Sequence, residues 1–305
     1  MPDERRRGFH TPLHTMLLVV LACFGLLYVA VIPVFEAPDE PAHFAKAYGL
    51  AEGQAILVDH PRWLVAYIMD TFDARHGKLD LPSFRKVRSL LAQHDGRVPN
   101  IVFNASHYLA FSYALHAGAI RVVNMLGDGP SRLPWAVYAC RLVSLMLFLL
   151  LVGVAFWLAP SMVWPFFWVA ATPMALSQAS VVSLDGLVLG TSMVILAGSA
   201  AETGLRTFGL IVLTACFLLV VTKPPYAPLI LVPAAYLAVR ELPGKALRFL
   251  LLGCTAVAAV LALTAWGHAL KGAGVYSKVI EAAREYVSPN IDPDAQIRFL
   301  CESPL

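Results

Sequence analysis

The sequence predicts an all-α polytopic membrane protein, and three observations lead to this fold class. Hydrophobic residues make up 58% of the 305 residues and charged residues 14%, whereas about 25% of an average soluble domain is charged. Uncharged runs near the length of a membrane-crossing helix recur along the chain. The net charge of +3 is small, and the scattered basic residues do not indicate a nucleic-acid partner.

The first element is a predicted span at residues 14–34, which follows Arg5-Arg6-Arg7. The length of its uncharged run is closer to that of a full span than to that of the short apolar core of a secretory signal. We therefore expect this helix to stay in the mature protein and not to be cleaved off. The positive-inside rule places the arginines, and with them the N-terminus, in the cytoplasm.

Six further spans follow, which gives a bundle of about seven transmembrane helices. Pro160-Ser161 supplies the turn between the first two of the six. We place them at residues 140–159, 162–182, 186–202, 207–222, 225–239 and 249–269.

The segment Ala105–Val123 is apolar enough to span but also contains polar residues, among them His107 and Arg121. If it crossed the membrane, the basic cluster Arg240–Arg248 would lie outside, against the positive-inside rule. We therefore expect this segment to lie in the interface or to re-enter. The transmembrane module is then 1–269, with an extracytoplasmic helical loop at 35–138 and the start of an extracytoplasmic C-terminal part at 270–305.

An amphipathic helix is predicted inside the 35–138 loop, beginning at Ser83 and ending at Asp95-Gly96. Its apolar and basic residues fall on opposite faces, as in a helix that lies on anionic headgroups. A phosphate-binding role is the alternative.

The main candidate for chemistry is Pro38–Phe44, with Asp39, Glu40 and His43 directly after the first span. We expect Asp39 to be the N-cap of a helix, its carboxylate pointing into the N-terminus, where the dipole favours the ionised form. Glu40 and His43 fall on one helix face. Alternatively, the segment is only a capped amphipathic helix at a membrane exit. A divalent metal at these residues is a further alternative, although hard cations prefer more oxygen ligands.

Asp185 is the only charged residue between Arg141 and Glu202. Inside a span an acid costs about 2.5–3.5 kcal/mol, so Asp185 is either functional or at the end of a span. Gln178 belongs to the polar residues that precede it. We predict a functional role on the same membrane face as Asp39, with a helix cap as the alternative.

Two cations are candidates for contact with a phosphate. Lys223 precedes Pro224-Pro225-Tyr226 at the outer interface and acts there as a point charge, or it only snorkels to the surface. Arg141 stands at the entry of a span, where it meets an anionic headgroup or a buried acid. The five cysteines form no framework, and we predict no structural disulfide.

Four segments together resemble a family of bacterial membrane proteins known as domain of unknown function 2142. They are P-D-E-x-x-H-F at 38–44, P-x-x-x-x-Q-x-S-x-x-S-x-D at 173–185, K-P-x-Y-A-P at 223–228 and D-P-x-x-Q at 292–296. The similarity runs from about residue 15 to the end of the chain. The family in turn looks like a branch of the GT-C glycosyltransferases, which use polyprenyl-phosphate sugars.

This resemblance implies a sugar transfer from a polyprenyl-phosphate donor to a glycan or lipid acceptor at the outer face of the bacterial cytoplasmic membrane. It implies Asp39 as the catalytic base, and Glu40 as a partner that orients it. His43, Asp185, Lys223, Arg141, Tyr226 and Gln178 are then the substrate-binding candidates. Relatives continue past the Gln296 region whereas this chain ends at Leu305, so the resemblance implies a C-terminally truncated form, with loss of activity as one expectation.

Two alternatives from other classes remain open. In a transporter or flippase for a lipid-linked glycan, the same residues would bind and not react, although the paired repeats typical of transporters are not visible in the sequence. In a non-catalytic subunit derived from such an enzyme, activity would be lost.

Overall fold

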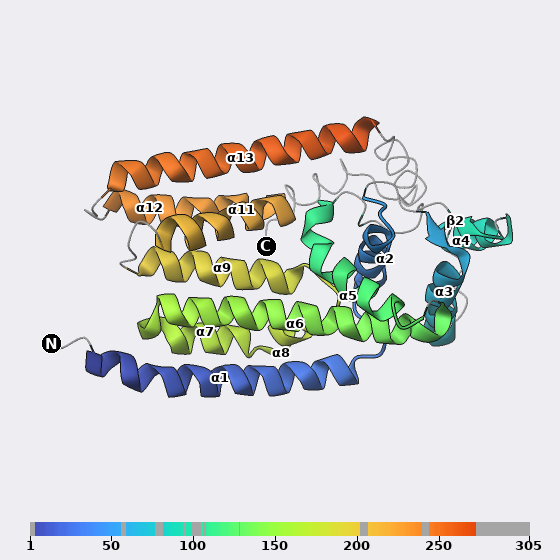
Figure 1. The fold of residues 1–305 in the computed structure, drawn as a ribbon, viewed down its shortest axis with the longest axis horizontal. Helices are drawn as coiled ribbons and strands as arrows, with labels where there is room; N and C mark the ends of the chain where they lie inside the picture. The colour runs from blue at the N-terminus through green and yellow to red at the C-terminus, as the bar shows by residue number, and fades with distance from the viewer. Residues whose placement is uncertain are drawn as a thin grey trace, which may run out of the picture.

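The computed structural model shows a bundle of long, nearly parallel helices with a layer of shorter helices at one end (Figure 1). It describes the residues 4–55, 59–76, 82–93, 95–98, 105, 108–127, 129–201, 207–239 and 244–272. The predicted C-terminal part 270–305, with Cys301 and the 292–296 motif, lies almost entirely outside these residues.

The bundle in the described part of the chain includes six long or intermediate apolar segments. Three contain candidate membrane spans: Pro12–Val31, Pro130–Leu158 and Lys245–Ala269. These lie in α1 (Glu4–Val31), in η3 (Pro130–Arg132) with α6 (Leu133–Leu158), and in α13 (Lys245–Gly272). Three shorter segments are α9 (Asp185–Ala200), η5 with α11 (Phe208–Thr222) and η6 with α12 (Pro224–Val239). The chain is therefore a helical membrane protein, as its composition predicts.

The predicted span at 162–182 is wrong as a single helix. After a short 3-10 turn, η4 (Pro160–Met162), the chain forms α7 (Val163–Ala170) and α8 (Pro173–Ala179). Proline restricts the residue before it to extended conformations, and Thr172 accordingly has φ −60° and ψ 141°. A hydropathy run does not register this break, because the residues on both sides of it are apolar.

The remaining predicted spans are shifted at their ends. The helix α6 begins at Leu133, seven residues before the predicted 140, and α1 ends at Val31 and not at residue 34. Both shifts have the same cause: helix ends follow proline and turn geometry, whereas a span is drawn where charge is absent.

Close helix packing in the bundle depends on small residues. The helices α6 and α9 pack side by side in a core that contains Phe148, Phe156 and Ile195. A Cβ on Gly190 would lie 2.8 Å from the Cβ of Leu151, so only glycine allows this approach of α9 to α6.

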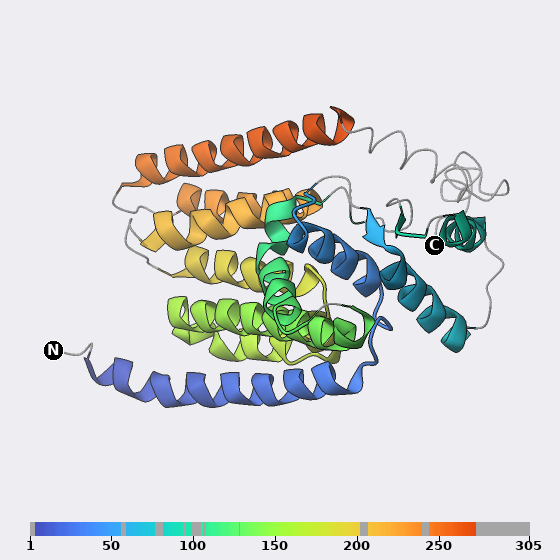
Figure 2. The same ribbon diagram turned by 45° about the vertical axis from the view of Figure 1, so that its right-hand side comes forward.

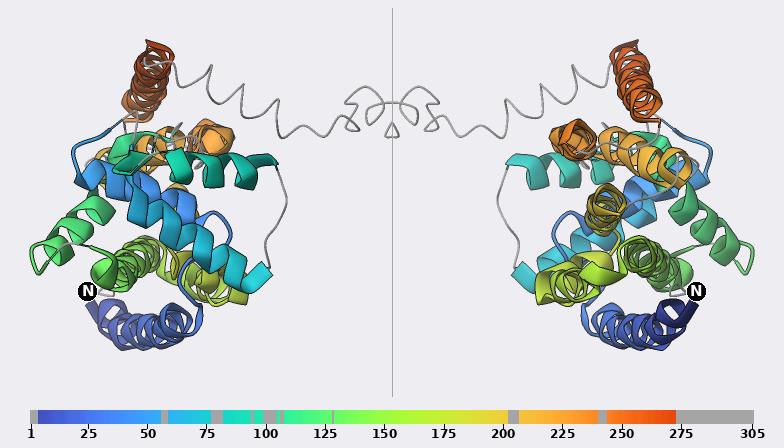
Figure 3. Two further views of the ribbon diagram at one scale, coloured as in Figure 1. Left: turned by 90° about the vertical axis from the view of Figure 1, so that its right-hand side faces the viewer. Right: turned by 90° about the vertical axis from the view of Figure 1, so that its left-hand side faces the viewer.

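The shorter elements gather at the end of the bundle opposite the N-terminus (Figures 1 and 2). Figure 3 looks along the bundle axis and shows these elements across its end. They are α2 (Glu40–Ala51), α3 (Arg62–His76), α4 (Pro82–Gln93), η2 (Ala110–Tyr113), α5 (Ala114–Asn124) and η3 (Pro130–Arg132), with strand β1 (His60–Pro61) antiparallel to β2 (Arg97–Val98).

This layer has its own apolar contacts. Phe44 of α2, Leu64 of α3 and Ile120 of α5 belong to one buried cluster. The helix α4 covers its apolar face with protein, since Val87 packs with Val65 of α3 and Val98 of β2. The predicted amphipathic helix is therefore present, but its buried Val87 faces α3 and not a lipid surface.

Candidate functional site

A buried ion pair fixes the connection between α1 and α2. Nε and Nη2 of Arg141 on α6 each donate to Glu40 over 2.7 Å. The same guanidinium donates to the carbonyls of Val29, Ile32 and Pro33, where α1 ends. Arginine is suited to this position because its planar fork satisfies a carboxylate and free helix-end carbonyls together.

Glu40 has further partners within the protein. Its carboxylate accepts the backbone N–H groups of Phe35 over 3.0 Å and of Val182 over 3.1 Å. Both Glu40 and Arg141 are 0% exposed. Of the two partners predicted for Arg141, the structure shows the buried acid and not a phosphate, so its role as a substrate-binding residue is corrected. The predicted catalytic role of Glu40 is corrected too, because Glu40 is a structural anchor with no oxygen open to a substrate.

Asp39 is held next to this anchor in an unusual backbone conformation. It precedes α2 with φ 60° and ψ −4°, in the left-handed region that residues other than glycine seldom adopt. Its side chain is exposed and makes no capping hydrogen bond. The prediction that its carboxylate caps α2 is wrong, because the carboxylate accepts no hydrogen bond from the first turn of the helix. Strain of this kind is common at functional sites.

Asp185 and Lys223 form the second ion pair of the site. The Lys223 ammonium, directly after α11, donates to Oδ1 of Asp185, the first residue of α9. Burial alone would lower the pKa of Lys223, but the hydrogen bond and the negative charge of Asp185 raise it above its ordinary value of 10.5. The side chains remain 18% and 40% exposed, respectively, so this pair is open to solvent or to a ligand.

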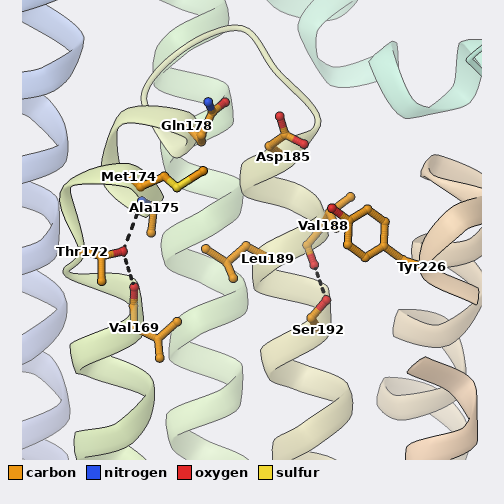
Figure 4. A pocket seen from close by; sticks show the side chains of 10 residues that line it. All are labelled: Val169, Thr172, Met174, Ala175, Gln178, Asp185, Val188, Leu189, Ser192 and Tyr226. Carbon is orange, nitrogen blue, oxygen red and sulfur yellow. Dashed lines mark hydrogen bonds between the residues drawn. The ribbon is translucent and has the colours of Figure 1, made fainter. Parts of the chain in front are cut away.

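Asp185 also lines a pocket of about 500 Å³ between α8 and α9. Gln178 of α8 lies at the same end of the pocket as Asp185, and Tyr226 closes one side (Figure 4). The remaining lining is mostly apolar: Val169, Thr172, Met174, Ala175, Val188, Leu189 and Ser192. The pocket is therefore an apolar groove with a polar, charged mouth. Gln178 and Tyr226, both predicted to bind substrate, line this pocket.

A buried aromatic network lies beside this mouth. Nδ1 of His43 on α2 is hydrogen-bonded to the Tyr113 hydroxyl over 2.6 Å, and the His43 ring stacks on Tyr108 with centroids 5.5 Å apart. Burial, with smaller contributions from Tyr108 and Asp185, raises the pKa of Tyr113 well above 10.0. The network thus joins α2 to the Asp185 side of the site.

Sequence reasoning identified only part of this arrangement. It placed Asp39, Asp185 and Lys223 on one membrane face, and the structure pairs Asp185 with Lys223. No hydrogen bond or ion pair joins Asp39 to either of them among the described residues, although Glu40 binds the loop that leads to Asp185. Tyr113 was missed. Its position three residues before His116 on a segment with a polar face was the available signal.

No three His, Cys, Asp or Glu side chains gather as a metal site in the part of the chain that the structure describes. The residues at Asp39 do not fit a divalent cation, because both oxygens of Glu40 are taken by Arg141 and Nδ1 of His43 is bonded to Tyr113.

The comparisons with known proteins give one result. No curated protein and no solved structure matches the chain. The family described as "Predicted membrane protein (DUF2142)" matches residues 22–305. This match begins inside α1 and covers the rest of the bundle, the layer of short helices and the pocket, and the chain belongs to this family of membrane proteins.

Proposed function

We propose that the protein is a membrane glycosyltransferase of the GT-C type, which moves a sugar from a polyprenyl-phosphate donor to a glycan or lipid acceptor. The bundle would have about seven spans, with its N-terminus in the bacterial cytoplasm and the α2–α5 layer at the outer face. The observation that carries the proposal is the Asp185–Lys223 pair at the mouth of an apolar pocket.

The shape and polarity of the pocket suit an amphiphile. Its walls are mostly apolar, which favours a hydrocarbon chain, and its charged mouth favours a polar headgroup. Val169 and Met174 in the lining are about half exposed or more. In a bilayer these exposed residues face lipid, so a polyprenyl chain would enter sideways without crossing water.

Lys223 supplies the positive charge for the donor phosphate. Of the two cations that the sequence proposed, Arg141 is committed to Glu40 and to the end of α1, whereas Lys223 keeps an exposed fraction. A phosphate at the mouth would take the ammonium from Asp185. The freed Asp185 carboxylate would then accept hydrogen bonds from hydroxyl groups of the sugar, and the Gln178 side-chain amide could accept or donate them.

Asp39 is the base in this proposal. The acceptor oxygen attacks the anomeric carbon, the bond from that carbon to the phosphate oxygen breaks, and the electron pair leaves with the phosphate. Asp39 takes the proton of the acceptor hydroxyl. Attack from the side opposite the leaving phosphate inverts the anomeric configuration, and a product with retained configuration would exclude this mechanism.

The test is transfer from a radiolabelled polyprenyl-phosphate hexose by the purified protein in nanodiscs, with a mixed cell-envelope lipid and glycan extract as acceptor. Asp39→Asn should reduce transfer by about 10²–10⁴-fold, the usual contribution of a general base, while binding of polyprenyl phosphate survives. Lys223→Met should reduce both the transfer and the binding of polyprenyl phosphate. Asp59→Asn, at an exposed acid of the same layer, is the matched control, and full activity of Asp39→Asn would remove the proposed mechanism.

A second candidate follows from one observation: both Arg141 and Lys223 are paired with protein carboxylates. This pairing favours a protein that holds or moves the lipid without reacting with it, as a flippase or a non-catalytic subunit does. In that case Asp39→Asn would leave lipid binding and transport unchanged, and no labelled product would form with any variant.

A further inference from the structure

The segment formed by η2 and α5 has two different faces. Tyr113, His116 and Ile120 point into the protein and are buried. The opposite face is apolar and 58% to 83% exposed. Its residues are Phe111, Leu115 and Val122, and Met125 and Leu126 continue it in the turn directly after α5.

The one charged residue on this exposed face is occupied. Arg121 turns its guanidinium toward α2, where it donates to the carbonyls of Ala51 over 2.8 Å and of Leu50 over 3.4 Å. Arg121 therefore caps the C-terminal end of α2. Its charge lies at the edge of the apolar face and not within it.

The height of α5 along the bundle follows from its contacts with α6. Nε2 of His116 lies 2.9 Å from the Ser144 hydroxyl, and the Cys140 thiol donates to the His116 carbonyl over 3.6 Å. Arg141 lies between these two residues and binds the carbonyls at the end of α1. The helix α5 is thus level with the place where a candidate span ends.

Two other helix ends lie at the same height. The Ser112 hydroxyl of η2 is 3.4 Å from the hydroxyl of Thr222, the last residue of α11. Lys223 follows directly and is paired with Asp185, the first residue of α9. Figures 1 and 2 show η2 and α5 beside the ends of α9 and α11 and not along their length.

The helix α5 by itself is too short to cross the membrane. Its 11 residues extend for about 16 Å at 1.5 Å per residue, roughly half of a hydrocarbon core of about 30 Å. An apolar, exposed helix at the height where spans end is what a bilayer interface accommodates. Trp135, 65% exposed near the start of α6, is of the residue type that gathers at such interfaces.

We propose that η2 and α5 lie flat in the boundary between headgroups and acyl chains, with Phe111, Leu115, Val122, Met125 and Leu126 in contact with lipid. The occupant of this face is the bilayer and not a second copy of the chain. Exposed apolar residues continue along α6 at lipid-facing spacings, at Leu142, Met146, Leu150 and Trp157, so one lipid-covered surface explains both. The Asp185–Lys223 pair then lies at the depth of lipid phosphates, whatever reaction the protein performs.

The test is the depth of spin labels in liposomes, measured from collision with oxygen, which enters lipid, and with a nickel chelate, which stays in water. The labels are placed at Leu115→Cys, Val122→Cys and Leu126→Cys in a chain whose native cysteines are replaced by serine. Asp59→Cys in the outer layer is the aqueous reference, and Leu150→Cys on the exposed side of α6 is the deep reference.

We expect the three labels to collide more with oxygen than Asp59→Cys does, and more with nickel than Leu150→Cys does. Nickel accessibility equal to that of Asp59→Cys would overturn the proposal in favour of a water-exposed helix. Depth equal to that of Leu150→Cys would overturn it in favour of a buried or crossing segment, and protection from both reagents would indicate contact with another protein copy. None of these outcomes depends on glycosyl transfer.

Discussion

Arg141 of α6 and Glu40 of α2 form a completely buried ion pair, with Nη2 2.7 Å from Oε2 and both side chains 0% exposed. The pair joins a membrane helix to the first helix of the layer of short helices. Because it also holds the end of α1 and the turn up to Asp39, it determines where the exposed Asp39 carboxylate is presented.

Arg141→Met should therefore be strongly destabilising. It leaves the Glu40 carboxylate buried without its cation, which costs about 3–5 kcal/mol of unfolding free energy. Denaturation in detergent measures the loss. The control is Arg97→Met, whose pair with Glu52 is exposed (44% and 26%), so that its loss should stay within about 1 kcal/mol. Equal losses in the two variants would contradict the anchoring role.

Asp185→Asn should make the Lys223 amine more reactive. The native pKa lies above 10.5 because Asp185 outweighs the effect of burial. A raised pKa means that the stabilisation is complete at neutral pH and is lost only as the pH rises through the folded-state value. Without Asp185, burial dominates and the pKa falls.

Acetylation of Lys223 by acetic anhydride at about pH 9, near the lysine titration range, should then be faster in Asp185→Asn than in the native protein. Mass spectrometry of the labelled peptide gives the rate, with Lys245 as the internal reference. An unchanged ratio of the two rates would show that Asp185 does not hold the ammonium in solution.

The buried His116 predicts a loss of stability in mild acid. Burial, with a smaller contribution from His43, lowers its pKa to about 4 from 6.5. The unfolded chain therefore binds a proton that the folded chain rejects, so its contribution to stability is present above pH 6.5 and is lost as the pH falls toward 4. His60 acts in the same direction, because burial, Arg97 and Lys46 lower its pKa to about 3.

His116→Gln keeps a polar partner for Ser144 and carries no charge at any pH. Its unfolding free energy should fall less steeply over this range than that of the native protein, by about 1.4 kcal/mol for each pKa unit removed. His268→Gln, at an exposed position on α13, should keep the native slope. If the His116 variant also keeps it, His116 is not the group that titrates.

Sequence reasoning could predict the membrane bundle and one half of the candidate site. Hydropathy and the positive-inside rule assigned Asp185 and Lys223 to one face, and both residues stand where a run ends, so their meeting was within reach. Composition alone excluded a soluble fold.

The rest depends on contacts that no local pattern contains. Arg141 and Glu40 are separated by 101 positions, and His43 and Tyr113 by 70. From the sequence, the partner of Arg141 could be a phosphate or a buried acid. Only the packing of α6 against α1 and α2 decides between these two partners. The left-handed backbone of Asp39 is likewise not visible in a local pattern; Phe35, which donates to the Glu40 carboxylate, also has a positive φ.

The last prediction concerns the glycine that brings α8 against α9 and so shapes the pocket. A Cβ on Gly186 would lie 2.8 Å from the Cα of Ala179, a backbone atom that cannot rotate away. Gly186→Ala should therefore push the two helices apart, cost about 1–3 kcal/mol as overpacking does, and weaken binding of polyprenyl phosphate by moving Gln178 away from Asp185. Gly253→Ala on α13, where a Cβ meets nothing within 4 Å, should be neutral or slightly stabilising, since alanine favours a helix. If Gly186→Ala keeps the native stability but binds polyprenyl phosphate more weakly, the two helices move apart without strain. If both its stability and its binding are native, the contact between Gly186 and Ala179 does not shape the pocket.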